Sequence, residues 1–237
     1  MNAPSDIDRI INGYLLQTDL GELVSSARRI EANVQDLVAS MGDLPQEVDE
    51  DALYRYPVPM LSEDGSCSIV DELAPTPYDL TGALGSRSYA TTRKLRLLHQ
   101  LVERAVWITG ADWLGVYQRR TRHDGSEALV KLAYRGRPSR AEFPLTAAFA
   151  RVSTNAQVGV SGRAKVIADV ESHTREGGAF YVCDSAVQSE ACLPLFLAES
   201  RTIAGIVDAE ATAQDFFNHE RLAVLVALAL VAPACLI

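Results

Sequence analysis

A cysteine and several carboxylates lie close together in the second half of this 237-residue sequence. Cys183 precedes Glu190, which opens a short apolar run, and Asp208 and Glu210 follow in the next apolar run. A thiol is a nucleophile and a redox group, and a carboxyl group can donate a proton or bind a cation. This pattern indicates redox or nucleophilic sulfur chemistry on a small polar ligand.

The carboxylates share one face if both apolar runs are strands. Alternate side chains of a strand point the same way, so Asp208 and Glu210 would lie together, near Glu190 at the start of its own strand. Crowded carboxylates repel one another, and burying them requires a bound cation or shared protons. We expect the three acids to bind a cationic group such as an ammonium and to supply an acid. The alternative is a solvated strand face.

Three further side chains are candidates for a site. Trp113 and Tyr117 are four residues apart on a predicted strand and so share a face. They would form an aromatic wall against a sulfur or ammonium group, or pack as ordinary core residues. His173 precedes two glycines in what the sequence predicts to be a mobile lid. It is either an acid–base group or a solvated loop histidine.

The remaining cysteines raise the question of how an oxidised Cys183 would be reduced. A sulfenic acid on Cys183 needs a second thiol to resolve it. Cys192 should lie on the same strand face as Glu190, and Cys67 stands in an acidic loop, so both are candidate resolving thiols. The alternative for Cys183 and Cys192 is a packed core cysteine, which is also what we expect of Cys235.

Composition excludes several classes of function. The net charge of -9 argues against a nucleic-acid groove or an anionic membrane as partner. The cysteines lack the paired spacing of zinc ligands, so we expect no metal, and nothing indicates a cofactor. No secretory signal is visible, which predicts reduced thiols and a cytoplasmic location. The apolar run over 222–237 is interrupted by Pro233 and is shorter than the roughly 20 residues of a membrane span, so it predicts a buried closing helix.

The first 90 residues differ in character from the rest. Apolar residues at three- and four-residue steps predict a helix over 6–40, with Ser5 or Asp6 as its N-cap, although Gly13 and Gly21 weaken a single continuous helix. Residues 42–90 are rich in Pro, Asp, Ser and Gly and predict a long loop. We therefore divide the chain into a helical and loop-rich segment over 1–90 and a domain over 91–237.

The second part alternates between helical and strand patterns. A helix over 91–109 should end at Gly110, and a last helix should begin near Asn218. Asp124-Gly125 and Glu199-Ser200 mark two hairpin turns. This order predicts an α+β fold with an antiparallel sheet and helices packed on one face. Strands are predicted at 113–117, 128–134, 143–145, 191–198 and 202–209.

Five segments resemble one family. They are Asp112–Tyr117, Tyr134–Arg137, Gly159–Gly162, Cys183–Glu190 and Gly205–Glu210. Over about 93–233 the chain resembles a GAF domain, and more narrowly the free methionine-(R)-sulfoxide reductases built on that fold. The resemblance implies a GAF-like fold and reduction of a small free amino-acid-like sulfoxide with a thioredoxin-type reductant. Its implied catalytic residues are Cys183, Glu190 and Asp208, and its implied substrate-binding residues are Trp113, Tyr117, Glu190, Asp208 and Glu210.

The chain also departs from that family. Ser161 stands where the family's redox loop carries a cysteine, and Ser139 or Arg140 stands near another family cysteine. Residues 1–90 have no counterpart in it. The ligand pocket is therefore retained, whereas the thiol-recycling residues are not.

These departures leave three functions open. The first is a sulfoxide reductase regenerated through Cys192, Cys67 or an external thiol. The second is a sensory or regulatory module that binds a small ligand without turnover. The third is a diverged enzyme of a specialised pathway. We also expect a homodimer through helices 93–109 and 218–232, because the latter is apolar nearly all round.

Overall fold

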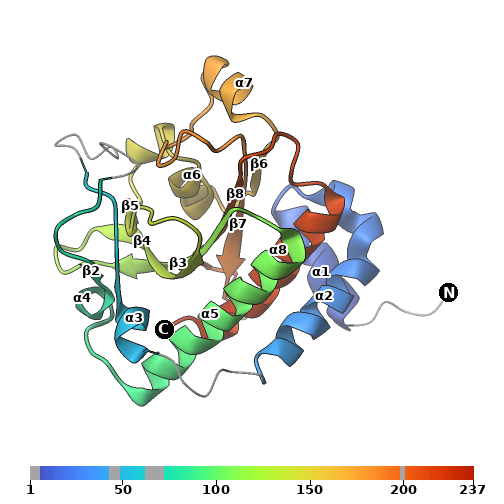
Figure 1. Ribbon diagram of the computed structural model, residues 1–237. Coiled ribbons are helices and arrows are strands. Elements are labelled where there is room, and N and C mark those ends of the chain that lie inside the picture. The colour runs from blue at the N-terminus through green and yellow to red at the C-terminus, as the bar shows by residue number, and fades with distance from the viewer. Residues whose placement is uncertain (1–5, 43–48, 62–71, 198–200) are drawn as a thin grey trace.

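The computed structural model describes residues 6–42, 49–61, 72–197 and 201–237. Three sequence expectations fall outside these ranges: Ser5 as an N-cap, the acidic loop around Cys67, and the turn at Glu199-Ser200. Within the described residues, helices and an antiparallel sheet form the α+β arrangement expected from the sequence (Figure 1).

The centre of the molecule is a six-stranded antiparallel sheet in the order β5-β4-β3-β8-β7-β6. Two hairpins, β3–β4 and β7–β8, lie side by side through the pairing of β3 with β8. The turn at Asp124-Gly125 closes the first hairpin, with Gly125 at a φ of 81°. The strands are β3 (Trp113–Thr121), β4 (Glu127–Arg135), β5 (Glu142–Pro144), β6 (Lys165–Ile167), β7 (Ser189–Phe196) and β8 (Ile203–Ala211).

Two long helices cover one face of this sheet. α5 (Tyr89–Thr109) begins where the Ser88 side chain accepts from the Thr91 amide, and it ends at Gly110 in the left-handed conformation. α8 (His219–Val231) begins at Asn218, whose side chain accepts from the amides of Glu220 and Arg221. The end of α5 at Gly110 and the start of α8 at Asn218 were predicted. The short helix η3 (Ala232–Cys235) follows α8.

The N-terminal segment folds onto these helices. The predicted helix over 6–40 is divided into α1 (Asp6–Gln17), η1 (Gly21–Ser26) and α2 (Ala27–Ser40), and Asp19 between them has a φ of 62°. α2 packs along α8, and apolar side chains of α1 and α2 join the core between the sheet and α5. The core is thus continuous across residue 90, and a domain boundary there stays a prediction.

This packing changes the argument for a dimer. α8 is apolar nearly all round because it is buried on several sides: the sheet, α5 and α2 all contact it (Figure 1). No surplus apolar face on α8 is left within the described chain to require a second subunit. Dimerisation stays a prediction, without the observation that motivated it.

The described parts of the segment over 42–90 contain more regular structure than the long loop that its composition predicted. It contains α3 (Glu50–Tyr54), β1 (Arg55–Tyr56), β2 (Tyr78–Asp79) and α4 (Leu80–Leu84). β1 and β2 pair with each other and place Tyr56 against Tyr78. Tyr54 and Tyr56 are buried, so this segment is anchored to the domain by aromatic side chains.

The second face of the sheet carries its own cover, which corrects the expectation of helices on one face only. α6 (Thr154–Ser161) packs on β7 and β8 from the side opposite α5 and α8, next to η2 (Phe149–Arg151). The projecting helix α7 (Val170–Arg175) follows β6 (Figure 1). Among the described helices, none combines the length and apolarity that crossing a membrane requires.

Candidate functional site

The three predicted acids meet on the face of the sheet that α6 covers. Glu190 on β7 is paired with Glu210 on β8, and Asp208 stands opposite Cys192. Glu190 is 1% exposed and Asp208 is 3% exposed, while Glu210 is half-buried. A solvated strand face is therefore wrong for Glu190 and Asp208. We call Glu190, Asp208 and Glu210 the acid floor.

Burial and mutual repulsion control the protonation of the acid floor. Burial raises the pKa of Asp208 to about 6, although Asn155 opposes the rise by donating its amide to Asp208 Oδ2 at 2.6 Å. Burial raises the pKa of Glu190 well above its ordinary value, and the charges of Asp208 and Glu210 raise it further. Both effects favour the protonated form of Glu190, which lies beside the carboxyl group of Asp208.

Two oxygen atoms of the acid floor lack donors. Glu190 Oε2 and Asp208 Oδ1 are buried and accept no hydrogen bond within the described chain. A buried acceptor without a donor costs about 1–3 kcal/mol, and more when it is charged. Such atoms point to a donor supplied from outside the protein, and an ammonium group offers three donors and a compensating charge.

An aromatic side chain lies beside the acid floor. A Cβ atom on Gly115 would stand 2.4 Å from Trp113 Cη2, and one on Gly136 would stand 2.6 Å from Trp113 Cδ1. The indole therefore occupies the space that these two glycines leave open. Gly115 pairs with Asp208 across β3 and β8, so the ring covers the sheet next to that carboxylate. Tyr117 lies deeper, with its ring centroid 6.3 Å from that of Trp113.

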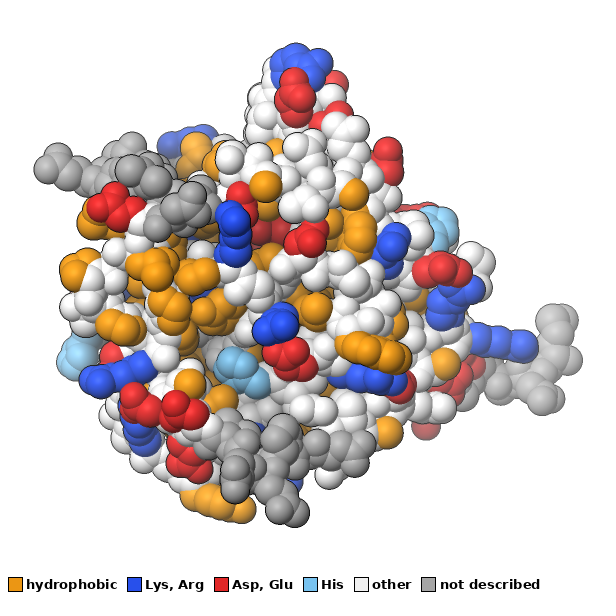
Figure 2. All heavy atoms as spheres, in the orientation of Figure 1, with side chains coloured by type: hydrophobic (Ala, Val, Ile, Leu, Met, Phe, Trp, Pro, Cys, Tyr) orange, Lys and Arg blue, Asp and Glu red, His pale blue; other side chains and the backbone are white. Residues whose placement is uncertain are grey.

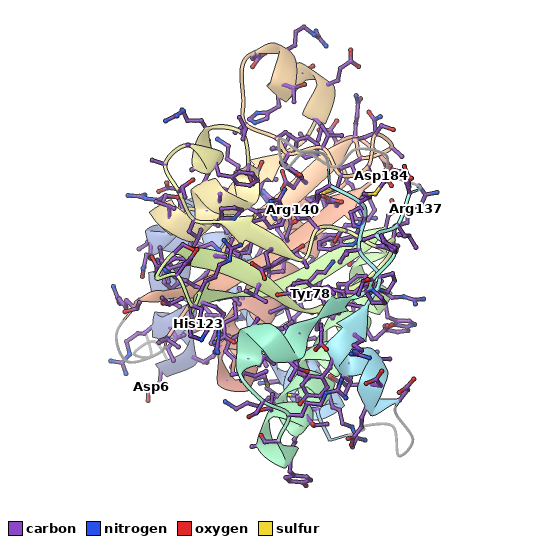
Figure 3. All side chains as sticks on the ribbon, turned by 90° about the vertical axis from the view of Figure 1, so that its left-hand side faces the viewer. Asp6, Tyr78, His123, Arg137, Arg140 and Asp184 are labelled. Atoms are coloured by element: carbon purple, nitrogen blue, oxygen red, sulfur yellow. The ribbon has the colours of Figure 1, made fainter. Side chains whose placement is uncertain are left out.

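A cavity of about 310 Å³ opens over this arrangement. Cys183, which is half-buried, lines it together with Glu210 and Trp113. Arg137 and Asp184 also line it and form an ion pair at 3.4 Å, side by side at one edge of the molecule (Figure 3). The structure thus brings the predicted thiol, one acid of the floor and one predicted aromatic to a single cavity.

The predicted resolving thiols are placed differently. Cys192 is fully buried in an aromatic and aliphatic cluster with Trp113 and Tyr117. Burial and the nearby carboxylates raise the pKa of the Cys192 thiol, which disfavours the thiolate that resolution requires. This geometry favours the core alternative for Cys192. Cys235 is buried in the core on the opposite side of the sheet, as expected, and Cys67 lies outside the described residues.

His173 is neither a solvated loop residue nor part of the cavity surface. It lies in α7, its Nε2 is 3.2 Å from the Ala179 carbonyl oxygen, and its ring fills the space beside Gly178. The same carbonyl accepts a hydrogen bond of 2.9 Å from Thr154 at the start of α6. His173 therefore fastens the chain after α7 to α6. Ser161, at the exposed end of α6, accepts from the Arg163 amide at 3.2 Å.

Sequence reasoning missed four residues around the cavity. Asn155 lies in a stretch without clear periodicity. Arg137 lies in one of the segments that resemble the family, but nothing else in the sequence marks it as a site residue. Lys131 is the one charged residue inside the apolar strand pattern over 128–134, a signal that was visible. Ser139, which contacts Lys131, had been noted only as a departure from the family.

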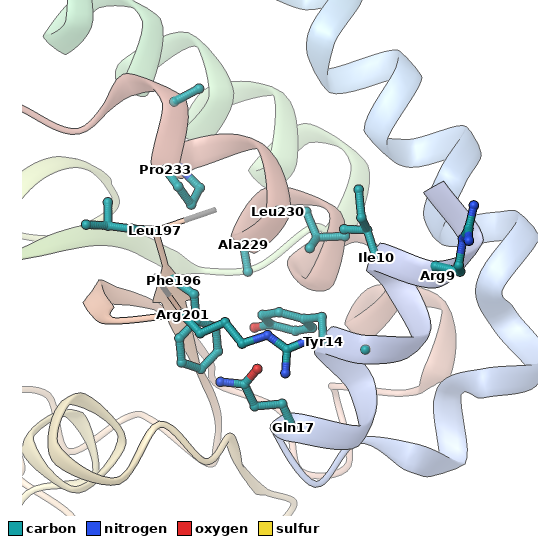
Figure 4. Close-up of a pocket in the computed structure, with 12 residues that line it drawn as sticks. Arg9, Ile10, Tyr14, Gln17, Phe196, Leu197, Arg201, Ala229, Leu230 and Pro233 are labelled. Atoms are coloured by element: carbon teal, nitrogen blue, oxygen red, sulfur yellow. The ribbon is translucent and has the colours of Figure 1, made fainter. Parts of the chain in front are cut away.

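Other regions have different chemistry. A cavity of about 540 Å³ lies between α1, the β7–β8 hairpin and α8; two arginines and several apolar side chains line it, and it contains no predicted site residue (Figure 4). On the face seen in Figure 2, acidic and basic side chains are interspersed. The described part of the chain holds no cluster of His, Cys, Asp and Glu suited to a metal ion.

Comparisons with known proteins establish the fold. No family model matches the chain, and no curated protein matches it. The type II free methionine-R-sulfoxide reductase from Thermoplasma acidophilum aligns over 62% of this chain and 94% of its own, with 17% identity and a TM-score of 0.53. A free methionine-R-sulfoxide reductase from Neisseria meningitidis, in complex with its substrate, aligns over 60% of this chain and 78% of its own, with 22% identity and a TM-score of 0.48. A structure of the GAF domain aligns over 66% of this chain and 82% of its own, with 15% identity and a TM-score of 0.49. This chain has a GAF-like fold, and identities this low show the fold alone.

Proposed function

We propose that this protein binds a small free amino-acid-like ligand in the 310 Å³ cavity and reduces a sulfoxide group on it, as in free methionine sulfoxide. One observation carries the proposal. Two buried carboxylates with undonated oxygens, Glu190 Oε2 and Asp208 Oδ1, lie on the same sheet face as Glu210, which lines the cavity together with Cys183. The structural neighbours named for this activity share the fold, and they add plausibility to the substrate class.

The cavity offers complementary groups for both ends of an amino acid. The acid floor would accept the ammonium, which supplies donors for the undonated oxygens and offsets the repulsion among the acids. Arg137 would take the ligand carboxylate, because its ion pair with Asp184 is long at 3.4 Å and lies on the cavity surface. Trp113 offers a ring face to a methyl or sulfur group.

The reaction balances with one thiol and one proton donor. Glu190, whose pKa is raised by burial and by the neighbouring carboxylates, donates its proton to the sulfoxide oxygen while the Cys183 sulfur attacks. The sulfur–oxygen bond of the ligand breaks, the oxygen passes to Cys183 as a sulfenic acid, and the thiol proton replaces the one that Glu190 gave. The ligand leaves as a sulfide, reduced by two electrons, while Cys183 is oxidised by two. A thioredoxin-type dithiol would then restore the thiol and release water.

A second candidate is a ligand-binding module without turnover. The position of Ser161 and the burial of Cys192 favour it, since neither offers an accessible thiol to resolve Cys183. A diverged enzyme of a specialised pathway would use the same acid floor on another substrate. In both alternatives the acid floor still binds the ligand, and only the chemistry at Cys183 differs from the proposal.

The decisive experiment compares binding with turnover. Calorimetry with free L-methionine-(R)-sulfoxide is expected to show binding to the wild type and to Cys183→Ser. A thioredoxin-coupled assay should show reduction by the wild type and none by Cys183→Ser, with a gain of one oxygen on Cys183 by mass spectrometry. Cys235→Ser, altered on the other side of the sheet, serves as the matched thiol control and should remain active. Binding without oxygen transfer would move the protein to the module class, and absent binding would refute the substrate class.

A further inference from the structure

A buried lysine stands behind the cavity wall. Lys131 on β4 is 0% exposed, and its Nζ donates to the carbonyl oxygen and to the hydroxyl of Ser139, both at 2.8 Å. Three aromatic rings surround the same nitrogen, with centroids at 4.1 Å for Tyr134, 5.1 Å for Tyr56 and 5.9 Å for Trp113. Burying an ammonium costs several kcal/mol unless hydrogen bonds and ring faces compensate, and here both are present.

Lys131 belongs to a set of donors that hold one loop. The loop over 136–141 lines the cavity with Arg137 and Ser139, and its carbonyl groups accept hydrogen bonds from the sheet in succession. The donors are Trp113 Nε1 to Arg137 at 3.0 Å, Lys131 Nζ to Ser139, the Tyr117 hydroxyl to Arg140 at 3.2 Å, and the Lys131 amide to Ala141 at 2.9 Å. The wall of the cavity is therefore fixed by the residues beneath it.

Two hydroxyl groups also belong to this set. Lys131 Nζ donates to the Ser139 hydroxyl oxygen at 2.8 Å, and the Tyr117 hydroxyl donates to the Arg140 carbonyl oxygen at 3.2 Å. Removing the ammonium would remove both hydrogen bonds that Lys131 Nζ donates to Ser139, so the loop would lose part of its attachment to the sheet.

A tyrosine from the segment before residue 90 completes the ring of aromatic side chains around the Lys131 ammonium. We call Lys131, Tyr56, Trp113 and Tyr134 the lysine cage. Tyr56 of β1 is buried and donates its hydroxyl to the Lys131 carbonyl oxygen at 2.8 Å. Its ring also packs against Tyr134 and Tyr78, with centroids at 5.5 Å and 5.4 Å. Tyr78 donates to Glu142 on β5 at 2.5 Å, which ties β2 to the sheet as well. Tyr56 is thus the one ring of the lysine cage that comes from residues 1–90, and it packs behind the cavity wall.

We propose that Lys131 and Tyr56 are positioning residues of the candidate site: together they hold Trp113 and the 136–141 loop in the geometry that ligand binding requires. Neither residue lines the cavity, so each acts through others. The inference rests on the proposed function for the identity of the ligand, whereas the positioning itself is measurable without any ligand. It assigns a role in the site to the N-terminal segment, which the family resemblance left unexplained.

Trp113 provides a ligand-independent readout. The chain has two tryptophans, and in a Trp107→Phe background Trp113, which is 6% exposed, becomes the single fluorophore. Acrylamide should quench the Trp113 fluorescence of that protein weakly. Adding Lys131→Met should increase the quenching. The upper limit is the quenching of Trp107, which is 73% exposed and can be measured alone in Trp113→Phe. The rate at which an alkylating reagent modifies Cys183 should change together with the quenching in Lys131→Met. Lys165→Met, on exposed β6, is the matched control and should leave both measurements unchanged.

A rescue experiment separates charge from packing. Lys131→Ala should leave a space lined by the three rings, and n-propylammonium should lower its quenching toward the wild-type level, whereas n-propanol should not. Affinity for L-methionine-(R)-sulfoxide should fall about tenfold or more in Lys131→Met, because Trp113 and the 136–141 loop are no longer held in the binding geometry. Tyr56→Phe keeps the ring and loses one hydrogen bond, so a smaller change in the same direction is expected.

The outcomes distinguish this inference from the proposed function. If the wild type binds no sulfoxide, the proposed function fails, and the quenching and rescue measurements still decide the positioning. Quenching and alkylation at wild-type values in Lys131→Met would overturn the inference even if the ligand binds, and so would equal rescue by the alcohol. If Lys131→Met is unfolded by circular dichroism, the same two measurements on Tyr56→Phe decide, and wild-type values there would also overturn it.

Discussion

Replacing Asp208 with asparagine should make the protein more stable while weakening its ligand binding. Burial raises the pKa of Asp208 to about 6 from an ordinary 3.8. Each pKa unit corresponds to about 1.4 kcal/mol, so holding this carboxylate ionised in the folded protein costs up to about 3 kcal/mol. Asp208→Asn keeps the shape and removes the charge, and the Asn155 amide can rotate to present its oxygen to the new amide. The variant should therefore recover most of that free energy.

The pH dependence gives the sign of the effect. Between pH 3.8 and about 6 the folded state binds the Asp208 proton and the unfolded state has released it. Folding stability therefore decreases as pH rises through this window, and the cost is complete above it. The advantage of Asp208→Asn should be largest at pH about 8 and should vanish near pH 4, where the wild-type carboxyl is neutral in both states.

Urea unfolding at a series of pH values measures this directly. The difference in free energy of unfolding between Asp208→Asn and wild type should approach about 3 kcal/mol at high pH and fall to zero in acid. Glu176→Gln, at an exposed carboxylate after α7, is the matched control and should stay within about 0.5 kcal/mol of wild type. An advantage that is absent at high pH, or one that persists unchanged in acid, would refute the electrostatic reasoning. Calorimetry should show at least about a tenfold loss of ligand affinity in the same variant.

Three further predictions concern other parts of the chain. Burial lowers the pKa of His99 to about 4 from 6.5, so stability should fall by up to about 3 kcal/mol as pH decreases through that window, and His99→Gln should flatten this dependence in urea unfolding. Gly115→Ala would place a methyl group 2.4 Å from the Trp113 ring, so it should lower stability by about 1–3 kcal/mol and alter Trp113 fluorescence. If the reductase proposal holds, Cys192→Ser should keep the wild-type ratio of steady-state to single-turnover rates, because the Cys192 thiol is buried and an external dithiol reduces Cys183.

Each of these predictions has an outcome that contradicts it. A His99→Gln protein with the wild-type pH profile would show that the imidazole is not held neutral by burial. Unchanged Trp113 emission in Gly115→Ala would mean that the indole does not depend on the glycine, and Gly125→Ala in the hairpin turn, distant from the ring, is the comparison for stability alone. A steady-state rate of Cys192→Ser that is slowed more than its single-turnover rate would show instead that Cys192 resolves the oxidised Cys183.

Local sequence patterns determined much of the sheet and its flanking helices. The end of α5 at Gly110 and the start of α8 at Asn218 were predicted from the residue types at these capping positions, because a cap depends on residues within one turn. The hairpin at Asp124-Gly125 followed from turn chemistry that only a few residues satisfy. The common face of Asp208 and Glu210 followed from the two-residue period of a strand.

Only the tertiary structure decided what those elements face. The period of α8 shows that it is apolar nearly all round, but α2 rather than a second subunit covers its outer side. Asn155 reaches Asp208 because α6 packs on the face opposite α5, and Tyr56 reaches Lys131 because the segment before residue 90 folds back onto β4. A sequence pattern reports how polar each side of an element is, and it is silent about which distant element will pack there. The acids, the thiol and their order along the chain could be read from the sequence, whereas the buried lysine cage that supports them depends on contacts between residues far apart in the chain.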